Sequence, residues 1–359
     1  MDLKGMDLRE LEEFFIVLGE EAYRGKQMMK WLYGKGESNF AAMTDYGREL
    51  RGRLSEAASI GQLKVVTRQV SSDGDAEKYL FALADGHLVE SVLMSYEDHL
   101  GPSRMTACIS TQVGCAMGCT FCASSIGGFV RNLTAGEIVD QVLQIQKEIA
   151  SRQVRVANVV MMGTGEPLLN YDHVMKAVRI LNHPDGIAIG VRHIAISTCG
   201  IVPGIERLAT EGMQVKLAVS LHSANDEVRS SLMPVNRKYP LARLMESLQN
   251  YQRMTGRRVT IEYALIRGVN DGVHDAIALR ELLRGLTALI NLIPLNPVAE
   301  FSCQRSRDDS VERFKKVMDE AGIRTTVRKE RGVDIDAACG QLRKKARAAE
   351  GCHGIPEKA

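Results

Sequence analysis

The chain has 359 residues, with 46 Lys or Arg against 44 Asp or Glu, so its formal net charge of +2 neither requires nor excludes a nucleic-acid partner. The hydrophobic fraction of 45% is ordinary for a globular protein, and no apolar run approaches the roughly 18 to 20 residues that cross a bilayer. We therefore expect a cytoplasmic protein with no membrane span, built as one large domain and a small appendage.

The first 60 residues are predicted to form a small helical accessory domain. Leu8, Leu11 and Phe15 recur at helical spacing before Gly19, and a second apolar series ends at Gly34. Basic and aromatic residues lie within and just before this second series: Tyr23, Arg24, Lys26, Lys30 and Trp31. They suit either a contact with nucleic acid or a solvated face above a core aromatic side chain, and the sequence leaves both interpretations open.

Residues 61–104 are predicted to form a β-meander extension. The apolar pattern changes to alternation from about residue 63 to residue 96, and Asp73-Gly74 and Asp85-Gly86 mark turns between the strands.

From residue 105 to about residue 345, short apolar strands alternate with amphipathic helices. The predicted strands span residues 105–111, 158–163, 193–198, 215–221, 259–266 and 289–295. Helices are expected between them, including 135–150, where Thr134 and Glu137 form a capping box, and 240–255. Six βα units predict an α/β fold with a partial (βα)6 barrel of parallel strands. We expect residues 346–359 to be a flexible tail.

Each unusual polar motif follows the end of a predicted strand. A cysteine-rich loop follows the first strand, and the later motifs are Gly-Thr-Gly-Glu-Pro (163–167), Ser-Thr-Cys-Gly (197–200), Ser-Leu-His (220–222) and Asn-Pro (296–297). In barrels of parallel strands the active site lies at the carboxyl ends of the strands. These motifs are therefore expected to meet at one rim.

Three cysteines, Cys115, Cys119 and Cys122, lie at separations of four and three residues. With no fourth Cys or His nearby, their thiolates would hold three irons of a 4Fe-4S cluster and leave the fourth iron open. A structural zinc site normally has four ligands, and a disulfide knot is unusual in a chain with eight cysteines in 359 residues and no secretory signal. The spacing resembles that of the radical-SAM superfamily. That resemblance implies that the open iron binds the amine and carboxylate of S-adenosylmethionine (SAM), whose reductive cleavage gives a 5′-deoxyadenosyl radical.

The motifs around the rim also suit SAM. Glu166 offers a carboxylate within a glycine-rich turn, which can bind an ammonium group. Such a turn needs no ligand, and a single Ser or His after a strand is commonly a local cap. Beside the three cysteines, however, the turn resembles the radical-SAM element that binds the methionyl amine. The residues expected to bind SAM are Gly165, Glu166, Ser197, Ser220, Leu221, His222 and Asn296.

Several motifs together resemble the RlmN/Cfr family of radical-SAM RNA adenine methyltransferases. They are CIS-x-QVGC-x3-C-x-FC, MMGTGEPLLN, ISTCGIVPGI, SLHSAND, LMPVNRKYPL and DIDAACGQLR, and they cover most of residues 88–345. The segments YRGKQMMKWLY and FAAMT resemble the family's accessory helical domain. Pro167, where the Cfr branch typically has Ala, is closer to the RlmN branch, which methylates adenine carbon 2.

The resemblance implies complementary roles for two distant cysteines. Cys339 would receive a methyl group from one SAM, and the radical from a second SAM would abstract a hydrogen atom from that S-methyl group. The carbon radical would add to adenine carbon 2 and crosslink protein to RNA, and Cys108 would release the product by forming a disulfide with Cys339. Glu90 would be the proton acceptor. Without the resemblance, Cys108 within its strand would be interpreted as a structural thiol. Cys339, flanked by two alanines and a glycine, would suit either a reactive loop or a small buried thiol.

The same resemblance implies the partners. The substrates would be an adenine in the peptidyl-transferase region of large-subunit ribosomal RNA and the purine beside the tRNA anticodon, each presented as an unstacked base. One 4Fe-4S cluster, two SAM per turnover, a flavodoxin-like or ferredoxin-like electron donor and a monomeric enzyme are expected. Candidate phosphate contacts are Arg324, Arg328, Lys329, Arg331, Arg343, Lys344, Lys345 and Arg347. For any single one of them, a solvated surface charge is the favoured alternative. Cfr-like methylation of carbon 8 and a non-catalytic iron-sulfur RNA-binding factor are the alternatives.

Overall fold

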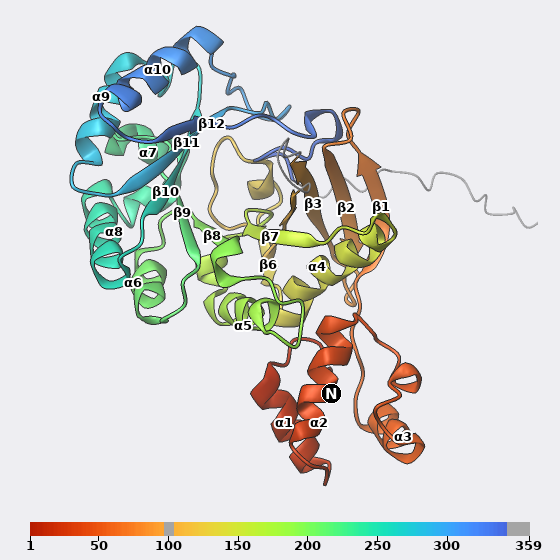
Figure 1. Cartoon of the computed structure of the whole chain (residues 1–359). Coiled ribbons are helices and arrows are strands. Elements are labelled where there is room, and N and C mark those ends of the chain that lie inside the picture. The colour runs from red at the N-terminus through yellow and green to blue at the C-terminus, as the bar shows by residue number, and fades with distance from the viewer. Residues whose placement is uncertain (97–103, 343–359) are drawn as a thin grey trace, which may run out of the picture.

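The computed structural model describes residues 1–96 and 104–342, which form a group of N-terminal helices and one large sheet with its covering helices (Figure 1). The cations Arg343, Lys344, Lys345 and Arg347 and the tail predicted for 346–359 lie outside the described residues. Within the described part of the chain, no helix combines the length and apolar character needed to cross a membrane.

The N-terminal helices enclose a small core of their own. Their elements are α1 (Leu8–Val17), α2 (Tyr23–Met29), the π-helix η1 (Lys30–Gly34), the 3-10 turn η2 (Phe40–Ala42) and α3 (Arg48–Ala57). Asp7 and Glu10 form a capping box that begins α1. Trp31 is buried in this core, whereas Tyr23 is exposed with the Arg24 guanidinium 5.0 Å from its ring centre. Trp31 is therefore a core aromatic side chain, as in the second interpretation of this segment, and not an exposed contact for nucleic acid.

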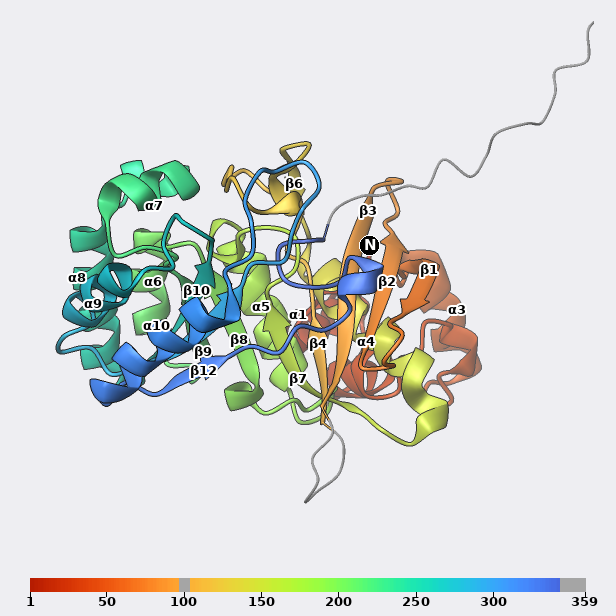
Figure 2. The same ribbon diagram turned by 90° about the horizontal axis from the view of Figure 1, so that it is seen from above.

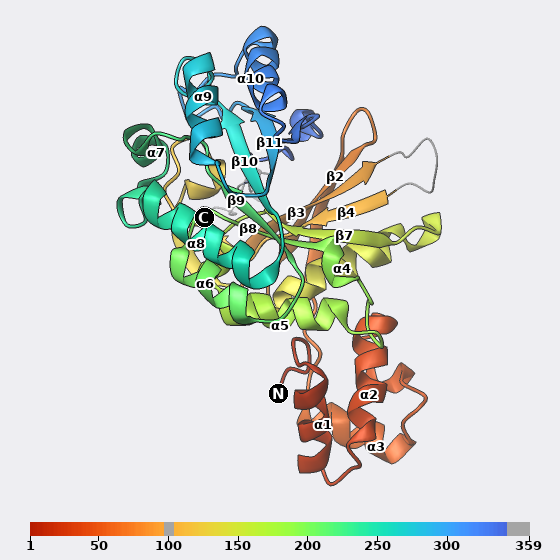
Figure 3. The ribbon, with the colours of Figure 1, turned by 60° about the vertical axis from the view of Figure 1, so that its left-hand side comes forward.

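These helices are anchored to the sheet domain beside α4 and α5 (Figure 3). The buried Lys4 ammonium lies 2.8 Å from the Asp140 carboxylate on α4, and the Leu63 N–H donates to the other oxygen of Asp140 at 2.7 Å. One buried carboxylate thus joins the start of the chain, the approach to the first strand and a barrel helix.

The sheet has ten strands in the order β1-β2-β3-β4-β7-β8-β9-β10-β11-β12. The predicted meander forms its antiparallel part, with β1 (Lys64–Val70), β2 (Ala76–Ala82) and β3 (Leu88–Tyr96). Strand β3 pairs antiparallel with β4 (Arg104–Cys108), and in that ladder Val92 lies opposite Cys108. The meander is therefore continuous with the barrel sheet, and it brings its inner face beside Cys108.

The parallel strands confirm the predicted α/β barrel. After β4 they are β7 (Val156–Met161), β8 (Ile194–Thr198), β9 (Lys216–Ser220), β10 (Val259–Leu265) and β11 (Ala288–Pro294). A further parallel strand, β12 (Thr325–Val327), pairs with β11. The sequence analysis missed β12 because three residues, two of them Thr, carry too short an apolar pattern.

Helices cover the convex side of the curved sheet (Figures 1 and 2). They are α4 (Ala135–Ile149), α5 (Tyr171–Asn182), α6 (Val202–Thr210), α7 (Asp226–Leu232), α8 (Leu241–Thr255), α9 (Val273–Leu282) and α10 (Asp308–Glu320). The predicted capping box of Thr134 and Glu137 begins α4. Short 3-10 turns complete the chain: η3 (Ala123–Ser125), η4 (Ala150–Arg152), η5 (Pro167–Leu169), η6 (Val191–His193), η7 (Pro234–Arg237) and η8 (Val333–Ile335).

Candidate active site

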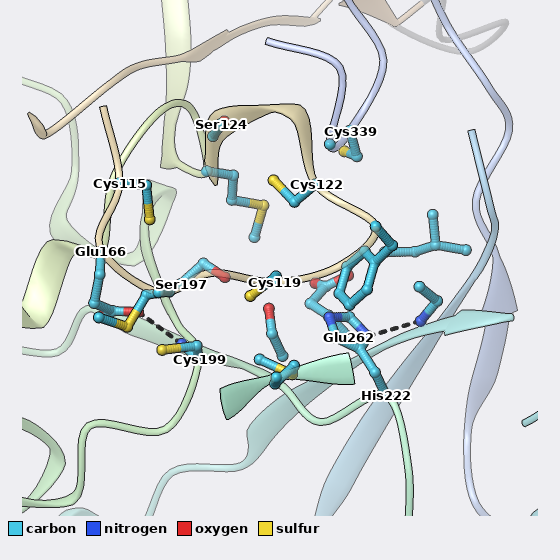
Figure 4. A pocket seen from close by; sticks show the side chains of 18 of the residues that line it. Cys115, Cys119, Cys122, Ser124, Glu166, Ser197, Cys199, His222, Glu262 and Cys339 are labelled. Atoms are coloured by element: carbon cyan, nitrogen blue, oxygen red, sulfur yellow. Dashed lines mark hydrogen bonds between the residues drawn. The ribbon is translucent and has the colours of Figure 1, made fainter. Parts of the chain in front are cut away.

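A cavity lies at the carboxyl ends of the parallel strands (Figure 4). Its lining includes Cys115, Cys119, Cys122, Gly165, Glu166, Ser197, Ser220, His222, Asn296 and Cys339. Loops that follow five different strands therefore converge on one space, as the position of the motifs after strands led us to expect.

The three cysteines are held by a loop within a small hairpin of β5 (Gln112–Gly114) and β6 (Phe129–Asn132), which the sequence analysis did not predict. Gly114 has φ +72°, and a Cβ there would lie 1.9 Å from the carbonyl oxygen of Gly128. Only glycine fits this crossing of the two hairpin strands. The Cys115 N–H donates to that same Gly128 carbonyl at 3.1 Å, so the hairpin fixes the start of the cysteine loop.

The electrostatics of the three thiols fit an iron-sulfur cluster. Burial raises the pKa of the Cys115 thiol to about 11 and also raises the pKa values of Cys119 and Cys122, and repulsion between neighbouring thiolates adds to the shift of Cys115 and Cys119. Bound iron supplies the positive charge that such a group of thiolates requires. Among the described residues, no three Cys, His, Asp or Glu side chains converge tightly enough to surround a single metal ion. The three thiols instead line one common cavity, as the ligands of a cluster of several irons would.

Glu166 is fixed at the cavity wall by its neighbours. One carboxylate oxygen accepts from the Leu168 N–H at 3.0 Å, and the other accepts from the Cys199 N–H at 2.8 Å, as the dashed line in Figure 4 shows. Gly165 before it has φ +114°, and a Cβ there would lie 2.7 Å from the side chain of Gln112. Glu166 also lines the cavity, and a carboxylate can accept from an ammonium group placed there.

His222 faces the cavity as a neutral imidazole. Its Nδ1 accepts from the Ala264 N–H at 2.8 Å, so the neutral ring carries its proton on Nε2. Burial lowers the pKa of His222 to about 3, and the positive charge of Arg229 adds to this effect. The ring of His222 also packs in a T-shaped arrangement with that of Phe121 in the cysteine loop, with ring centres 5.0 Å apart. A hydrogen-bond donor is thereby held in place without a positive charge.

We expect His222 to make folding stability sensitive to acid. Between its ordinary pKa of 6.5 and its folded-state pKa of about 3, the unfolded chain binds a proton that the folded chain does not. The stability that the neutral ring contributes is present above about pH 6.5 and decreases by about 1.4 kcal/mol per pH unit below it. Asn tolerates the φ of +59° at this position, so His222→Asn should fold. Between about pH 7 and about pH 4.5, urea unfolding should show a smaller decrease in the free energy of unfolding for His222→Asn than for the unchanged protein.

The exposed His173 on α5 provides a matched control for this titration. His173→Asn should lose as much stability as the unchanged protein over the same pH interval. An equal loss in the unchanged protein and in His222→Asn would contradict the role assigned to burial of His222.

The other predicted SAM residues divide into those that face the cavity and one that does not. Ser197 lies one residue before the end of β8, Ser220 is the last residue of β9, and both line the cavity. Asn296 is buried; its amide donates to the Cys339 carbonyl at 3.0 Å, and its Oδ1 has no hydrogen-bond partner among the described residues. An unpaired buried acceptor at the cavity fits a polar ligand.

Leu221 is the predicted SAM residue that does not line the cavity. Its side chain is fully buried in the core, its N–H donates to the Glu262 carbonyl, and its carbonyl accepts from Arg229. Ser220 and His222 on either side of it line the cavity, whereas the side chain between them points into the core.

Two charged residues of the cavity wall were not recognised as cavity residues from the sequence. Glu262 on β10 is buried; one oxygen accepts from the Asn291 amide at 2.9 Å, the other has no hydrogen-bond partner among the described residues, and burial raises its pKa. Arg328 follows β12 and lines the cavity together with Glu262 and Cys339. Electrostatic interaction with Cys339, and to a smaller extent with Glu262, raises the pKa of Arg328. An acidic residue within the apolar strand VTIEYAL was the available signal for Glu262.

Arg229 is a third residue that the sequence analysis missed. It is completely buried and donates to the carbonyls of Cys199, Ser220 and Leu221 and to Asn236 Oδ1. It therefore joins the ends of β8 and β9 beneath the cavity.

Cys339 lies where the cavity meets a second one that contains Cys108. Both cavities are lined by Cys122, Arg328 and Cys339. Cys108 is buried at the end of β4, and burial raises the pKa of its thiol to about 12. Next to Cys339, the Gly340 carbonyl accepts from the Ala123 N–H at 2.7 Å. The loop that carries Cys339 is thus tied directly to the loop that carries the three cysteines.

Glu90 lines a neighbouring cleft rather than either of these cavities. Together with Gly127 and Gly128 it borders that cleft, and Ser124 borders the cleft and both cavities. The Glu90 side chain is buried, and the Lys78 ammonium lies 3.3 Å from its Oε1. The predicted proton acceptor is therefore adjacent to the site and already faces a cation.

The predicted phosphate contacts are of different kinds. Arg324 and Lys329 are exposed, whereas Arg328 faces the cavity. Arg331 donates to the Asp75 carboxylate at 2.7 Å and to the Ser95 carbonyl at 2.8 Å, so its guanidinium binds the meander.

The chain is similar to one group of enzymes over nearly its whole length. Residues 1–60 match the model of the ribosomal RNA large subunit methyltransferase N-terminal domain, and residues 109–280 match the radical SAM superfamily. A probable dual-specificity RNA methyltransferase RlmN from Symbiobacterium thermophilum is 52% identical over 345 residues, covering 96% of this chain and 91% of the relative. A protein of the same description from Thermoanaerobacter sp. (strain X514) is 50% identical over 344 residues, covering 96% and 98%. The crystal structure of a radical SAM methyltransferase from Sphaerobacter thermophilus has a TM-score of 0.90 at 46% identity, covering 96% of this chain and 99% of that one.

Proposed function

Because the chain belongs to the RlmN family of radical SAM RNA methyltransferases, we propose that its target is carbon 2 of adenine in large-subunit ribosomal RNA and in tRNA. Membership makes the chain a SAM-dependent RNA methyltransferase with a radical mechanism, a 4Fe-4S cluster and two SAM per turnover. The observation that carries the proposal is the position of Cys339, which borders both the cavity of the three cysteines and the cavity of Cys108.

The cavity residues support separate roles in binding the cofactors. Cys115, Cys119 and Cys122 would hold the cluster, and the Glu166 carboxylate would accept hydrogen bonds from the methionyl ammonium of SAM. The remaining contacts to SAM would come from Ser197, Ser220, His222 and Asn296, together with the backbone at Gly165 and Leu221. With both cofactors bound, the site supplies a 5′-deoxyadenosyl radical.

Carbon 2 of adenine is electron-poor and does not attack a methyl sulfonium, so the methyl group must first be placed on the protein. The Cys339 thiolate would accept it by polar displacement, with the Arg328 guanidinium beside the sulfur. After transfer to adenine, Cys108 would attack the Cys339 sulfur and release the RNA. Burial keeps Cys108 protonated at rest, so it must lose its proton as it attacks. Glu90 would accept the proton that carbon 2 loses.

The remaining partners are also proposed. An external flavodoxin-like or ferredoxin-like protein would donate electrons, the enzyme would act as a monomer, and its RNA substrates support a cytoplasmic location. The exposed Arg324 and Lys329 are candidates for contacts with RNA phosphates.

The test is anaerobic reconstitution with iron, sulfide, SAM, a reductant and unmodified ribosomal RNA or tRNA. Digested RNA should contain 2-methyladenine, identified by mass spectrometry against standards for both positions. Methylation at carbon 8 would instead support a Cfr-like reaction. A fully reconstituted protein that forms neither 5′-deoxyadenosine nor methylated RNA would favour a non-catalytic iron-sulfur RNA-binding factor.

A further inference from the structure

The loop that carries Cys339 packs on the inner face of the meander. Figure 2 shows η8 and the chain around it beside β2 and β3. The apolar contacts join Ala76, Val92, Met94 and Cys108 of the sheet to Ala337 and Leu342 of the loop. The sheet residues of this cluster, which are distant in sequence from the Cys339 loop, thus form the surface on which the loop packs. We call this surface, formed by Ala76, Val92, Met94 and Cys108, the seat of the loop.

Polar contacts fix the loop on this seat. Arg331 binds Asp75 and the Ser95 carbonyl, and the Ser72 N–H donates to the Asp334 carboxylate at 2.8 Å. These residues lie at the turn between β1 and β2 and at the end of β3. Lys78 on β2 makes a further polar contact with the loop, to the Asp336 carbonyl.

Lys78 connects the loop to Glu90. On β2 it lies opposite Val92, and Val92 in turn lies opposite Cys108, so these three side chains share one face of the sheet. The Lys78 ammonium lies 3.3 Å from Glu90 Oε1 and 3.4 Å from the carbonyl oxygen of Asp336, three residues before Cys339. The side chain of Lys78 is only 9% exposed.

A buried ammonium is costly unless it is paired and hydrogen-bonded. Glu90 supplies the opposite charge and the Asp336 carbonyl supplies a further acceptor, so the position of Lys78 depends on both partners. A cation next to a carboxylate also favours the ionised form of that carboxylate, which is the form that accepts a proton. The seated loop and an ionised Glu90 therefore support each other through one side chain.

We propose that Lys78 is a positioning residue that keeps Glu90 ionised and correctly oriented when the Cys339 loop is seated. The inference rests on the proposed function, in which the crosslinked adenine must regain aromaticity. In that step the carbon 2–hydrogen bond would break and its proton would pass to Glu90. A 4Fe-4S cluster held by Cys115, Cys119 and Cys122 would supply the acceptor for the surplus electron of the adduct radical. Cys108 then supplies the electron pair of the disulfide bond. The pair of the broken sulfur–carbon bond passes to the methylene carbon, which takes up a proton to become the methyl group.

The test compares Lys78→Met with Lys64→Met, which removes an exposed lysine from the neighbouring strand β1. Lys78→Met should still acquire a methyl group on Cys339 and form 5′-deoxyadenosine from SAM. Release of methylated RNA should fall by roughly 10²-fold, the usual effect of losing a general base. The covalent protein–RNA adduct should accumulate and be visible on a denaturing gel and by intact-protein mass spectrometry. Lys64→Met should behave like the unchanged enzyme.

Two further variants separate this role from a purely structural one. Lys78→Arg keeps the charge and should release methylated RNA nearly as fast as the unchanged enzyme. Lys78→Gln keeps a hydrogen-bond donor toward Asp336 but not the charge, and should accumulate the protein–RNA adduct as Lys78→Met does. Thermal melts identify any variant that fails to fold. If Lys78 acts through Glu90, the double variant Lys78→Met/Glu90→Gln should release methylated RNA no more slowly than Glu90→Gln alone.

Three results would overturn the inference. Normal release by folded Lys78→Met or Lys78→Gln would show that the charge is not needed. Loss of Cys339 methylation in folded Lys78→Met would show that Lys78 serves only to seat the loop. An unchanged enzyme that forms no 2-methyladenine would refute the proposed function itself, and this inference with it.

Discussion

Cys339→Ala is expected to abolish RNA methylation while the 4Fe-4S cluster still assembles and SAM is still cleaved. Cys339 borders the cavity, but its loop is separate from the loop that holds the three cysteines of the cluster. Without its sulfur there is no site for the methyl group, so the radical has no S-methyl hydrogen to abstract. Methylated RNA should fall to background, a loss of more than about 10⁶-fold. Liquid chromatography of the same reaction would detect 5′-deoxyadenosine formed without coupling to methylation.

Cys303→Ala provides the matched control. Cys303 is a partly buried free cysteine in the loop between β11 and α10 and is not among the residues that line the cavity. Its replacement should leave methylation within about twofold of the unchanged enzyme, as is usual for a substitution away from the reacting groups. Substantial RNA methylation by Cys339→Ala would rule out a methyl carrier at this position.

Cys108→Ala is expected to trap the enzyme on its RNA. Cys108 and Cys339 line the same cavity, and the thiol of Cys108 is buried at the end of β4. Its removal leaves the cluster, SAM and Cys339 in place, so methyl transfer to Cys339 and addition to adenine should proceed. The sulfur–carbon bond then has no neighbouring thiol to break it. Each enzyme should stop after one addition, and release of methylated RNA should fall by at least about 10³-fold.

The trapped species can be measured directly. A denaturing gel should show a protein band retarded by labelled RNA, and ribonuclease digestion should leave a nucleotide attached to the peptide that contains Cys339. Cys303→Ala should show no such band. Repeated turnover and free methylated RNA from Cys108→Ala would contradict the assignment of Cys108 as the resolving thiol.

The fold followed from the sequence where the apolar patterns were long. Strands β7, β10 and β11 and helices α4 and α8 lie close to their predicted positions because each carries a full apolar segment bounded by polar or turn residues. Strand β12 has three residues and the β5–β6 hairpin depends on contacts between glycine backbones. Neither has a periodic pattern from which it can be predicted.

The candidate site followed from motifs and from the rule that loops after parallel strands converge. That rule brought the cysteines, Glu166, Ser197 and His222 to one cavity. It did not identify Glu262 or Arg328, because a charge within or just after a strand has meaning only when its partner across the barrel is known. Arg331 was interpreted as a phosphate contact for the same reason, whereas its partners lie in the turn before β2 and at the end of β3.

The meander shows what sequence patterns do not contain. Its alternation predicted three strands, but the pairing of Lys78 with Val92 and of Val92 with Cys108 depends on strand register. That register places the seat of the Cys339 loop next to Cys108 and Glu90. The extension is thereby linked to the chemistry of the barrel, which its composition alone did not indicate.

The most direct test of the account follows the methyl group itself. With SAM whose methyl group carries three deuterium atoms, transfer through Cys339 requires the 5′-deoxyadenosyl radical to remove one of them before the carbon reaches adenine. Mass spectrometry should therefore find two deuterium atoms in the new methyl group at carbon 2 and the third in 5′-deoxyadenosine. A product that retains all three deuterium atoms would show direct transfer of an intact methyl group and would contradict the mechanism.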